Sequence, residues 1–330
     1  MKTGILTTKT IASEDIKDTK SIMGMSSKGM EMAQYFLRDK IYSDKVLAVV
    51  REYICNAQDE HKKYNIDKNV DVKLTQIDSK WIWSVRDYAM GLNEYDIRNV
   101  FGMYFESTKS NENDSVGGFG IGGKAGFSYT DTFYVNSHHN GTKSCYVCTL
   151  GSGTKGIPVG EIYKISEEPT TEQGIEISLD VDKDARSFSK KTYNLVEFYL
   201  PNTNILFEDG YASKVYSPLQ PDAVKSVGDY VFNTYASHPN DLYNNDKYLI
   251  RMGGVIYPYN SPSARIGQHA KCIIVDVPIG KLSIPISRES IENTPLNEKV
   301  FADINKCLDL IKEEEGSTIT VPKFGAVCTG

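Results

Sequence analysis

The segment of residues 51–61 constrains the fold most, because it predicts one helix with a buried face and a line of polar side chains beside that face. Apolar residues recur there at helical spacing and form a single stripe. Glu52, Asn56 and Asp59 stand at i, i+4 and i+7, on a line about 100° from the centre of that stripe. Such a line borders the core and can build a pocket, in which Glu holds a proton and Asn offers an oxygen to a hard cation. A solvated helix face is the alternative.

A second informative segment follows the predicted strand of residues 81–87. Asp87 ends this strand, and a turn that contains Gly91 comes next. A carboxylate in this position lies at the floor of a cleft and can accept a hydrogen bond from an exocyclic amine such as that of adenine. Taken alone, the segment also fits a plain turn with a capping aspartate.

A third segment, residues 102–126, contains seven glycines and has no clear period. Repeated glycines allow backbone N–H groups to approach phosphates closely, and a following helix N-terminus favours bound anions. Lys109 lies in a small, polar run before the glycines. The segment predicts a nucleotide lid. It is neither a Walker loop, since no Gly-Lys-Ser/Thr ends it, nor a dinucleotide fingerprint, since it does not follow a strand.

Composition limits the classes of partner. The chain has 330 residues and a net charge of −6, which disfavours a bulk electrostatic grip on nucleic acid or on an anionic membrane. It contains no apolar run near the ~20 residues that cross a bilayer, and its first residues do not resemble a secretory signal. We expect a cytoplasmic protein whose six cysteines are free thiols.

The order of the three segments resembles the GHKL ATPase superfamily, which contains type II topoisomerases, ninety-kilodalton heat-shock chaperones, histidine kinases and MutL-type mismatch-repair proteins. The resemblance implies a Bergerat ATPase fold that binds ATP with Mg²⁺. It implies that Glu52 is the general base, that Asn56 ligates Mg²⁺ and that Asp59 lies beside the nucleotide. Asp87, with Gly91 in its motif, would bind the adenine amine. The nucleotide contacts that it implies in the third segment are Lys109, Gly117, Gly118, Phe119, Gly120, Ile121, Gly122 and Lys124.

The sequence departs from the superfamily pattern at two positions. Ala89 stands where the second motif has its first glycine, and it could narrow the backbone approach to the nucleotide. Ile175 follows Gly174 where the fourth motif has threonine, so its side chain cannot donate a hydrogen bond. Thr171 is a candidate substitute for that threonine.

A fifth segment, Ser287-Arg288-Glu289, resembles the Ser-Arg-Glu segment of the heat-shock chaperones. The resemblance implies that Arg288 reaches the γ-phosphate, for which a planar guanidinium fork is well suited. An Arg288 that pairs with Glu289 or Glu292 on a solvated helix start is the alternative.

Residues 41–53 are also similar to bacteriophage rapid-lysis A-type (RIIA) proteins, which contain a GHKL domain and are tied to lysis inhibition. This narrower resemblance implies a phage protein in the host cytoplasm, with a B-type rapid-lysis protein as partner and peripheral contact with the inner membrane. Such proteins can be longer, so the chain is either an N-terminal portion or a compact relative.

We expect an α/β protein of two domains. Residues 1–185 would form the ATPase domain, an α+β two-layer sandwich with helices over one face of a mainly antiparallel sheet. Within it, residues 1–22 would be an exchange arm and residues 102–126 the ATP lid. Residues 186–330 would form a smaller, transducer-like α/β domain that supplies Arg288 and contains a helix at 222–233.

The predicted function is Mg-dependent ATP binding and slow hydrolysis, coupled to lid closure and to formation of a homodimer. The alternative is a scaffold in which ATP is bound without hydrolysis. A histidine kinase is disfavoured, because no phosphoacceptor-helix histidine precedes the ATPase segments and His61 lies on the first-motif helix itself. A mismatch-repair or topoisomerase role rests on the fold alone.

Overall fold

The computed structural model divides the chain into two compact units, which are described separately. The first unit comprises Met1–Gln220, Gly253–Val255 and Ile286–Glu289, and the second contains the remainder. The residues that the structure describes are 26–104, 122–153, 157–198, 204–217, 220–235, 248–253, 255–259, 272–285 and 287–317.

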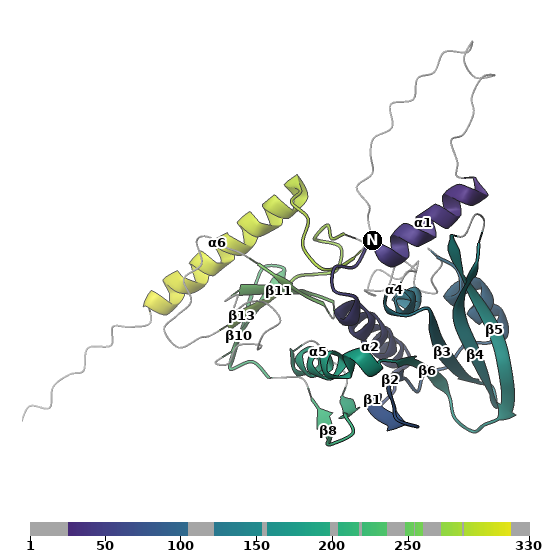
Figure 1. Ribbon diagram of the computed structural model, residues 1–330. Coiled ribbons are helices and arrows are strands. Elements are labelled where there is room, and N and C mark those ends of the chain that lie inside the picture. Colours follow the sequence, from purple (N-terminus) through teal and green to yellow (C-terminus); the bar gives the residue numbers. More distant parts are fainter. Residues whose placement is uncertain are drawn as a thin grey trace, which may run out of the picture. The chain divides into compact units, whose positions relative to one another are not determined.

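Among the described residues, an eight-stranded sheet forms the centre of the first unit (Figure 1). Its strand order is β5-β4-β3-β6-β2-β1-β7-β8, and neighbouring strands are antiparallel except for the parallel pair β1 and β7. The strands are β1 (Val70–Ile77), β2 (Lys80–Arg86), β3 (Thr132–His139), β4 (Thr142–Ser152), β5 (Pro158–Pro169), β6 (Gly174–Asp180), β7 (Ile205–Glu208) and β8 (Ser213–Tyr216).

Helices α2, α4 and α5 pack on this sheet against β1, β2 and β3 (Figure 1). The helical elements of the first unit are α1 (Ser27–Asp39), α2 (Lys45–Tyr64), α3 (Glu94–Asp96), the π-helix η2 (Ile97–Phe101), the 3₁₀ turns η3 (Gly122–Lys124) and η5 (Asp182–Asp184), α4 (Gly126–Tyr129) and α5 (Ala185–Phe198). The predicted α/β class is therefore confirmed.

Helix α2 has the boundaries that its sequence predicts. The Asp44 side chain caps its first turn by accepting the Leu47 amide at 3.0 Å. Asn65 ends the helix in the left-handed conformation, with φ of 52°. Val49, Val50 and Ile54 on its apolar stripe are completely buried. The apolar face of this helix is therefore part of the core of the first unit.

The first unit extends beyond residue 185, where the sequence analysis places its domain boundary. It runs to Gln220, because β7 pairs with β1 and β8 completes the same sheet. Ser287–Glu289 also belongs to this unit. The transducer-like role of residues 186–330 stays a prediction.

The second unit is built on a five-stranded sheet with the order β12-β11-β13-β10-β9, as far as its residues are described. Its elements are β9 (Ala223–Val227), β10 (Tyr230–Tyr235), β11 (Tyr248–Met252), β12 (Val255–Pro258), β13 (Cys272–Asp276) and α6 (Pro295–Ser317). The predicted helix at 222–233 is wrong. A hairpin of β9 and β10 replaces it, because a two-residue turn begins at Gly228 with φ of 60° and residues that favour strands, such as Val224, Val231 and Phe232, lie on both sides.

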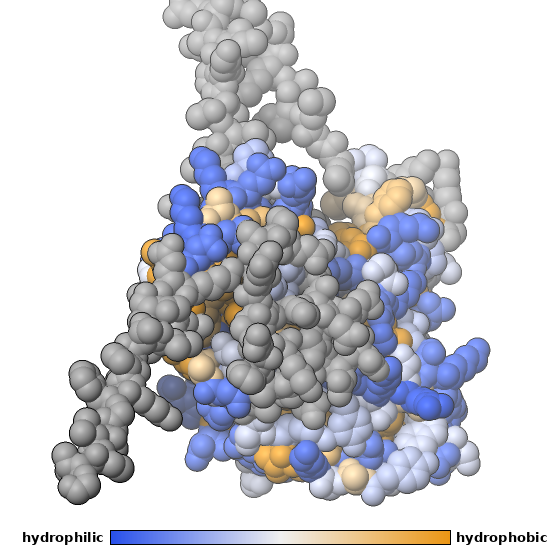
Figure 2. Space-filling view, turned by 90° about the vertical axis from the view of Figure 1, so that its left-hand side faces the viewer, coloured by the Kyte–Doolittle hydropathy of each residue, from blue (hydrophilic) through white to orange (hydrophobic). Residues whose placement is uncertain are grey.

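Charged and polar residues dominate the uncovered surface in Figure 2, as the mean hydropathy of −0.37 leads one to expect. None of the described helices combines the length and apolar character that a membrane span requires.

The side of the sheet that faces α5 contains a testable polar contact. Trp83 is completely buried, and its indole N–H donates to the equally buried Thr192 hydroxyl at 3.0 Å. Thr192→Val keeps the shape but leaves the indole N–H without an acceptor. We expect urea unfolding to report a loss of about 1–3 kcal/mol in the free energy of unfolding.

Thr192→Ser is the matched control, since it keeps the hydroxyl and loses one methyl group worth about 0.8 kcal/mol. A Thr192→Val protein with the wild-type denaturant midpoint would show that this hydrogen bond does not stabilise the unit.

Candidate functional site

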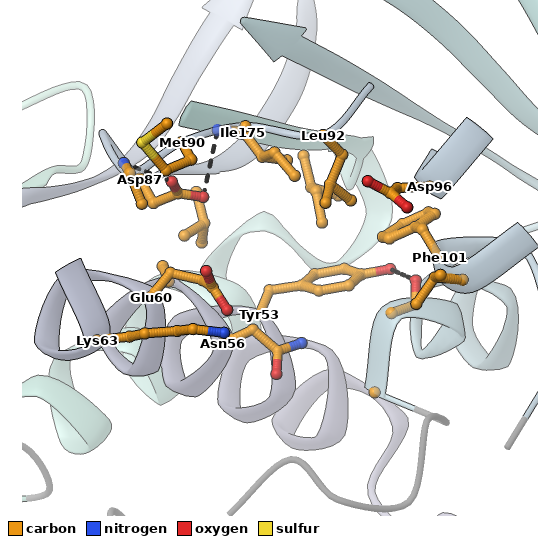
Figure 3. Close-up of a pocket in the computed structure, with 18 of the residues that line it drawn as sticks. Tyr53, Asn56, Glu60, Lys63, Asp87, Met90, Leu92, Asp96, Phe101 and Ile175 are labelled. Carbon is orange, nitrogen blue, oxygen red and sulfur yellow. Dashed lines mark hydrogen bonds between the residues drawn. The ribbon is translucent and has the colours of Figure 1, made fainter. Parts of the chain in front are cut away.

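A cavity of about 440 Å³ lies in the first unit between α2, the turn after β2, β6 and the helical turns η2 and η3 (Figure 3). Helix α2 supplies one wall, because Tyr53, Asn56, Ala57, Glu60 and Lys63 follow each other at helical spacing. The opposite wall is largely apolar and comes from the strand ends and the turn. Its described members include Val85, Met90, Leu92, Ile175 and Ile177.

Asp87 lies at the floor of this cavity with 7% of its surface exposed. One carboxylate oxygen accepts the Ala89 amide at 2.9 Å, and the other accepts the Ile175 amide at 3.2 Å (Figure 3). Burial raises the pKa of the Asp87 carboxyl to about 6, although the two amides oppose this shift by favouring the charged form. The acid is therefore ionised at neutral pH and faces a space large enough for a ligand.

Two glycines let the chain pass close to this acid. Gly91 has φ of 68°, and a Cβ atom there would lie 2.2 Å from the His138 carbonyl oxygen. Gly174 has φ of 105°, and a Cβ atom there would lie 2.1 Å from the Asp87 carbonyl oxygen. Any side chain would force β3 or β6 away from the turn. Close packing therefore explains why glycine stands at position 91, in the second motif, and at position 174, in the fourth motif.

The two departures from the superfamily pattern have a structural account. Ala89 is buried with a negative φ, so its position does not demand glycine, and its amide still bonds to Asp87. Ile175 contacts the same carboxylate through its backbone amide, and its side chain lines the cavity. Thr171 is exposed and does not line the cavity.

Glu52 lies next to the cavity, one turn of α2 before Asn56. It is 2% exposed, and a Cβ atom on Gly122 would lie 2.7 Å from its carboxylate. Two guanidinium groups flank it, with Arg51 and Arg288 each 3.4 Å from one of its oxygens. The structure therefore brings Glu52 and Arg288 together, although 236 residues separate them in the chain.

Arg288 is held in place by its neighbours on α2. Its backbone is in the left-handed region with φ of 54°, which costs a non-glycine residue about 1–2 kcal/mol. Arg51 compensates by donating to the carbonyl oxygens of Ser287 and Arg288 at 2.6 and 3.0 Å. Glu289 accepts the amides of Ser43 and Asp44 at the start of α2. Arg288 thus pairs with Glu52 instead of the alternatives Glu289 and Glu292.

The residues after the glycine-rich run are attached to the cavity wall. The Tyr53 hydroxyl accepts the Gly126 amide at 2.8 Å and donates to the Gly123 carbonyl at 3.3 Å. Lys124 is buried, and its ammonium donates to the carbonyl oxygens of Val100 and Met103 at the end of η2. It also lines the cavity, as do Gly122 and Gly123.

Some predicted site residues lie elsewhere. Asp59 is half-buried and is absent from the cavity lining, where Glu60 and Lys63 of the same helix appear instead. Its place beside a nucleotide stays a prediction. The remaining predicted contacts of the glycine-rich segment fall outside the described residues, namely Lys109, Gly117, Gly118, Phe119, Gly120 and Ile121.

Several cavity residues were not singled out from the sequence. Glu60 and Lys63 could have been found, because they stand four and seven residues after Asn56 on the same helix. His139 could not, since its ring nitrogen reaches the Met90 carbonyl at 2.9 Å only through the pairing of distant segments.

The donor set around Asn56 fits a magnesium ion shared with phosphates. The described residues contain no group of three or more His, Cys, Asp or Glu that could hold a metal by themselves. Mg²⁺ at nucleotide sites uses one or two protein oxygens together with phosphate and water. Asn56 offers such an oxygen, and Gly122 leaves space beside it, because a Cβ atom there would approach the Asn56 amide to 3.3 Å.

Comparison with known proteins finds a similarity to one ATPase family. Residues 44–172 match the family model described as "Histidine kinase-, DNA gyrase B-, and HSP90-like ATPase". A search of the curated proteins finds no match to the chain, so the similarity to rapid-lysis proteins rests on the residues alone. The family match covers α2, the Asp87 turn and β3 to β5. This part of the chain is therefore similar to GHKL-type ATPase domains, and the similarity supports ATP binding.

Proposed function

We propose that the first unit binds ATP with Mg²⁺ in the cavity between α2 and β6 and hydrolyses it slowly. The observation that carries this proposal is the Asp87 carboxylate. It is buried, held by two backbone amides and part of the cavity lining. An exocyclic amine of adenine is the hydrogen-bond donor that such a carboxylate lacks.

The cavity offers different surroundings to the two ends of a nucleotide. Apolar side chains around Asp87, including Met90 and Ile175, suit the faces of a base. Asn56, Lys124 and the backbone of Gly122 and Gly123 suit phosphates. Figure 3 shows Asp87 and Phe101 at opposite ends of the cavity, with Asn56 on the helix below.

Glu52 is the residue that we assign to general-base catalysis. Its carboxylate lies beside Gly122, where the missing side chain leaves room for the attacking water. The bound Mg²⁺, held through Asn56, would neutralise phosphate charge. Glu52 can accept a proton from water once a phosphate draws Arg288 away, and Arg288 would then stabilise the charge on the γ-phosphate.

The same ion pairs favour the alternative function. Each oxygen of the Glu52 carboxylate faces a guanidinium group, so neither oxygen is directed at a water molecule for as long as both contacts persist. If bound ATP does not release Arg288, the protein would bind ATP without turnover and act as a nucleotide-gated scaffold.

Removal of the base distinguishes the two functions. We expect Glu52→Gln to lower ATP turnover by about 10²–10⁴-fold, because the amide cannot take a proton from water. ATP affinity should stay within about threefold of wild type. Steady-state phosphate release measures turnover, and isothermal titration measures affinity.

Glutamine is the informative substitution, because Glu52→Ala would remove the one side chain that lies between the Arg51 and Arg288 guanidinium groups and destabilise the unit by about 3–5 kcal/mol. Glu176→Gln, on the strand that faces the cavity but outside its lining, is the matched control. Unchanged turnover in Glu52→Gln would remove Glu52 as the base, and wild-type binding without turnover would favour the scaffold.

Removal of the charge at the cavity floor tests the base-binding role. Asp87→Asn should weaken ATP binding by about 10–100-fold, because it replaces a charge-assisted hydrogen bond of about 1.5–3 kcal/mol. Wild-type affinity should also fall as the pH drops below about 6, since the Asp87 carboxyl becomes protonated there and no longer accepts the amine. Isothermal titration between pH 5 and pH 8 measures both effects.

Asp180→Asn is the matched control, because Asp180 lies at the other end of β6, accepts a backbone amide and does not line the cavity. An Asp87→Asn protein with wild-type affinity would contradict the adenine assignment.

The finer predictions rest on the resemblance and are part of this proposal. They are closure of residues 102–126 over ATP, a nucleotide-dependent homodimer with an exchanged N-terminal arm, a B-type rapid-lysis partner, a role in lysis inhibition, peripheral membrane contact and a cytoplasmic location.

We expect light scattering to give twice the molar mass when a non-hydrolysable ATP analogue is added. The same mass with and without the analogue would contradict the dimer.

A further inference from the structure

His61 is a buried histidine that the proposed function does not use. It lies in the last turn of α2 and is 1% exposed, outside the cavity lining. Its Nε2 atom accepts the Tyr88 amide at 2.9 Å. Nε2 can accept only when it carries no proton, so this contact requires the neutral ring.

The contact holds the peptide that joins Asp87 to Tyr88. A peptide group is planar and rigid, so the Tyr88 N–H and the Asp87 carbonyl turn together. His61 holds the N–H end of this plane. At the other end, the Asp87 carbonyl lies so close to Gly174 that a Cβ atom there would approach it to 2.1 Å. The orientation of Asp87 is therefore fixed from α2 on one side and from β6 on the other.

The Tyr88 side chain anchors the same residue to the neighbouring strands. Its hydroxyl donates to Asp71 of β1 at 2.5 Å. The Lys68 ammonium lies 3.2 Å from the centre of its ring, and the Arg86 guanidinium lies 5.1 Å from it. With its side chain held in this way, Tyr88 cannot follow a moving amide without breaking these contacts. The His61 contact and the contacts of the Tyr88 side chain therefore hold the same turn, which follows β2.

We propose that His61 is a positioning residue that holds the Asp87 carboxylate in the orientation that binds the nucleotide base, and that protonation of its ring releases the turn. This inference rests on the proposed function. A protonated ring presents an N–H to the Tyr88 N–H, so an attractive contact becomes a repulsive one. The affinity for ATP would then fall on protonation of His61 as well as on protonation of Asp87.

The groups around His61 favour a neutral ring at neutral pH. Burial lowers the pKa of His61, the Lys68 carbonyl and the Asp71 carboxylate oppose this shift, and the Lys68 ammonium adds to it. The centre of the Tyr88 ring lies 6.3 Å from the centre of the imidazole ring. Because the pKa is lowered, the ring is neutral at pH 7 and becomes protonated only in acid.

Two substitutions separate the hydrogen bond from the volume of the side chain. His61→Leu fills the site but cannot accept the Tyr88 amide. His61→Gln keeps an acceptor oxygen near the position of Nε2 and does not titrate. In the protein without nucleotide, we expect hydrogen exchange of the Tyr88 amide to be at least tenfold faster in His61→Leu and within threefold of wild type in His61→Gln.

Binding of ATP tests the functional half of the inference. We expect at least tenfold weaker binding in His61→Leu and near wild-type binding in His61→Gln at pH 7.5. Combined with Asp87→Asn, His61→Leu should add no further loss, because it acts through Asp87. In acid, log Kd of wild type should rise as the pH falls, and the slope for His61→Gln should be smaller by one proton.

The outcomes keep the two proposals apart. A wild-type protein that does not bind ATP overturns the proposed function and, with it, the role of His61 in binding. A wild-type protein that binds ATP, with His61→Leu exchanging and binding as wild type, overturns the inference alone. If His61→Leu does not fold, the acid slope of His61→Gln decides, and a slope equal to that of wild type overturns the inference.

Discussion

A buried carboxylate must be bonded, because an ionised acid without partners inside a protein costs several kcal/mol. Asp87 satisfies this constraint with two backbone amides, one from its own turn and one from β6. The pairing of β2 with β6 and the tight approach of Gly174 place those amides. The turn after β2 and the start of β6 therefore meet at one acid, which forms the floor of the cavity.

Helix α2 acts as the second support of the site, because its faces serve different neighbours. The apolar stripe packs into the core, and the adjacent line from Tyr53 to Lys63 forms the cavity wall. Arg51 and Glu52 contact the segment of Arg288, and His61 contacts the Asp87 turn. A rigid helix with a cap at both ends keeps these contacts at fixed spacing.

The ion pairs between Glu52 and the two arginines connect the geometry with the choice between enzyme and scaffold. In the proposed mechanism, the Glu52 carboxylate becomes accessible to water when a more strongly charged group, such as a phosphate, competes for Arg288. The backbone of Arg288 is strained, with a positive φ. Hydrogen bonds on either side of this residue hold it in place: Arg51 binds the Ser287 carbonyl, and Glu289 binds the Ser43 amide.

The sequence by itself determined the α2 helix, most strands of the first sheet and the order of the motifs, because hydrophobic periodicity and capping are local properties. It also singled out Glu52, Asn56 and Asp87. Only the tertiary structure decided that Glu52 and not Glu289 pairs with Arg288, that the Ile175 amide donates to Asp87 and that His61 holds the Tyr88 amide. These contacts join residues that the chain separates widely, and no local pattern encodes which partners a fold brings together. The failed helix at 222–233 shows the same limit, since pairing with β13 stabilises β10 as a strand.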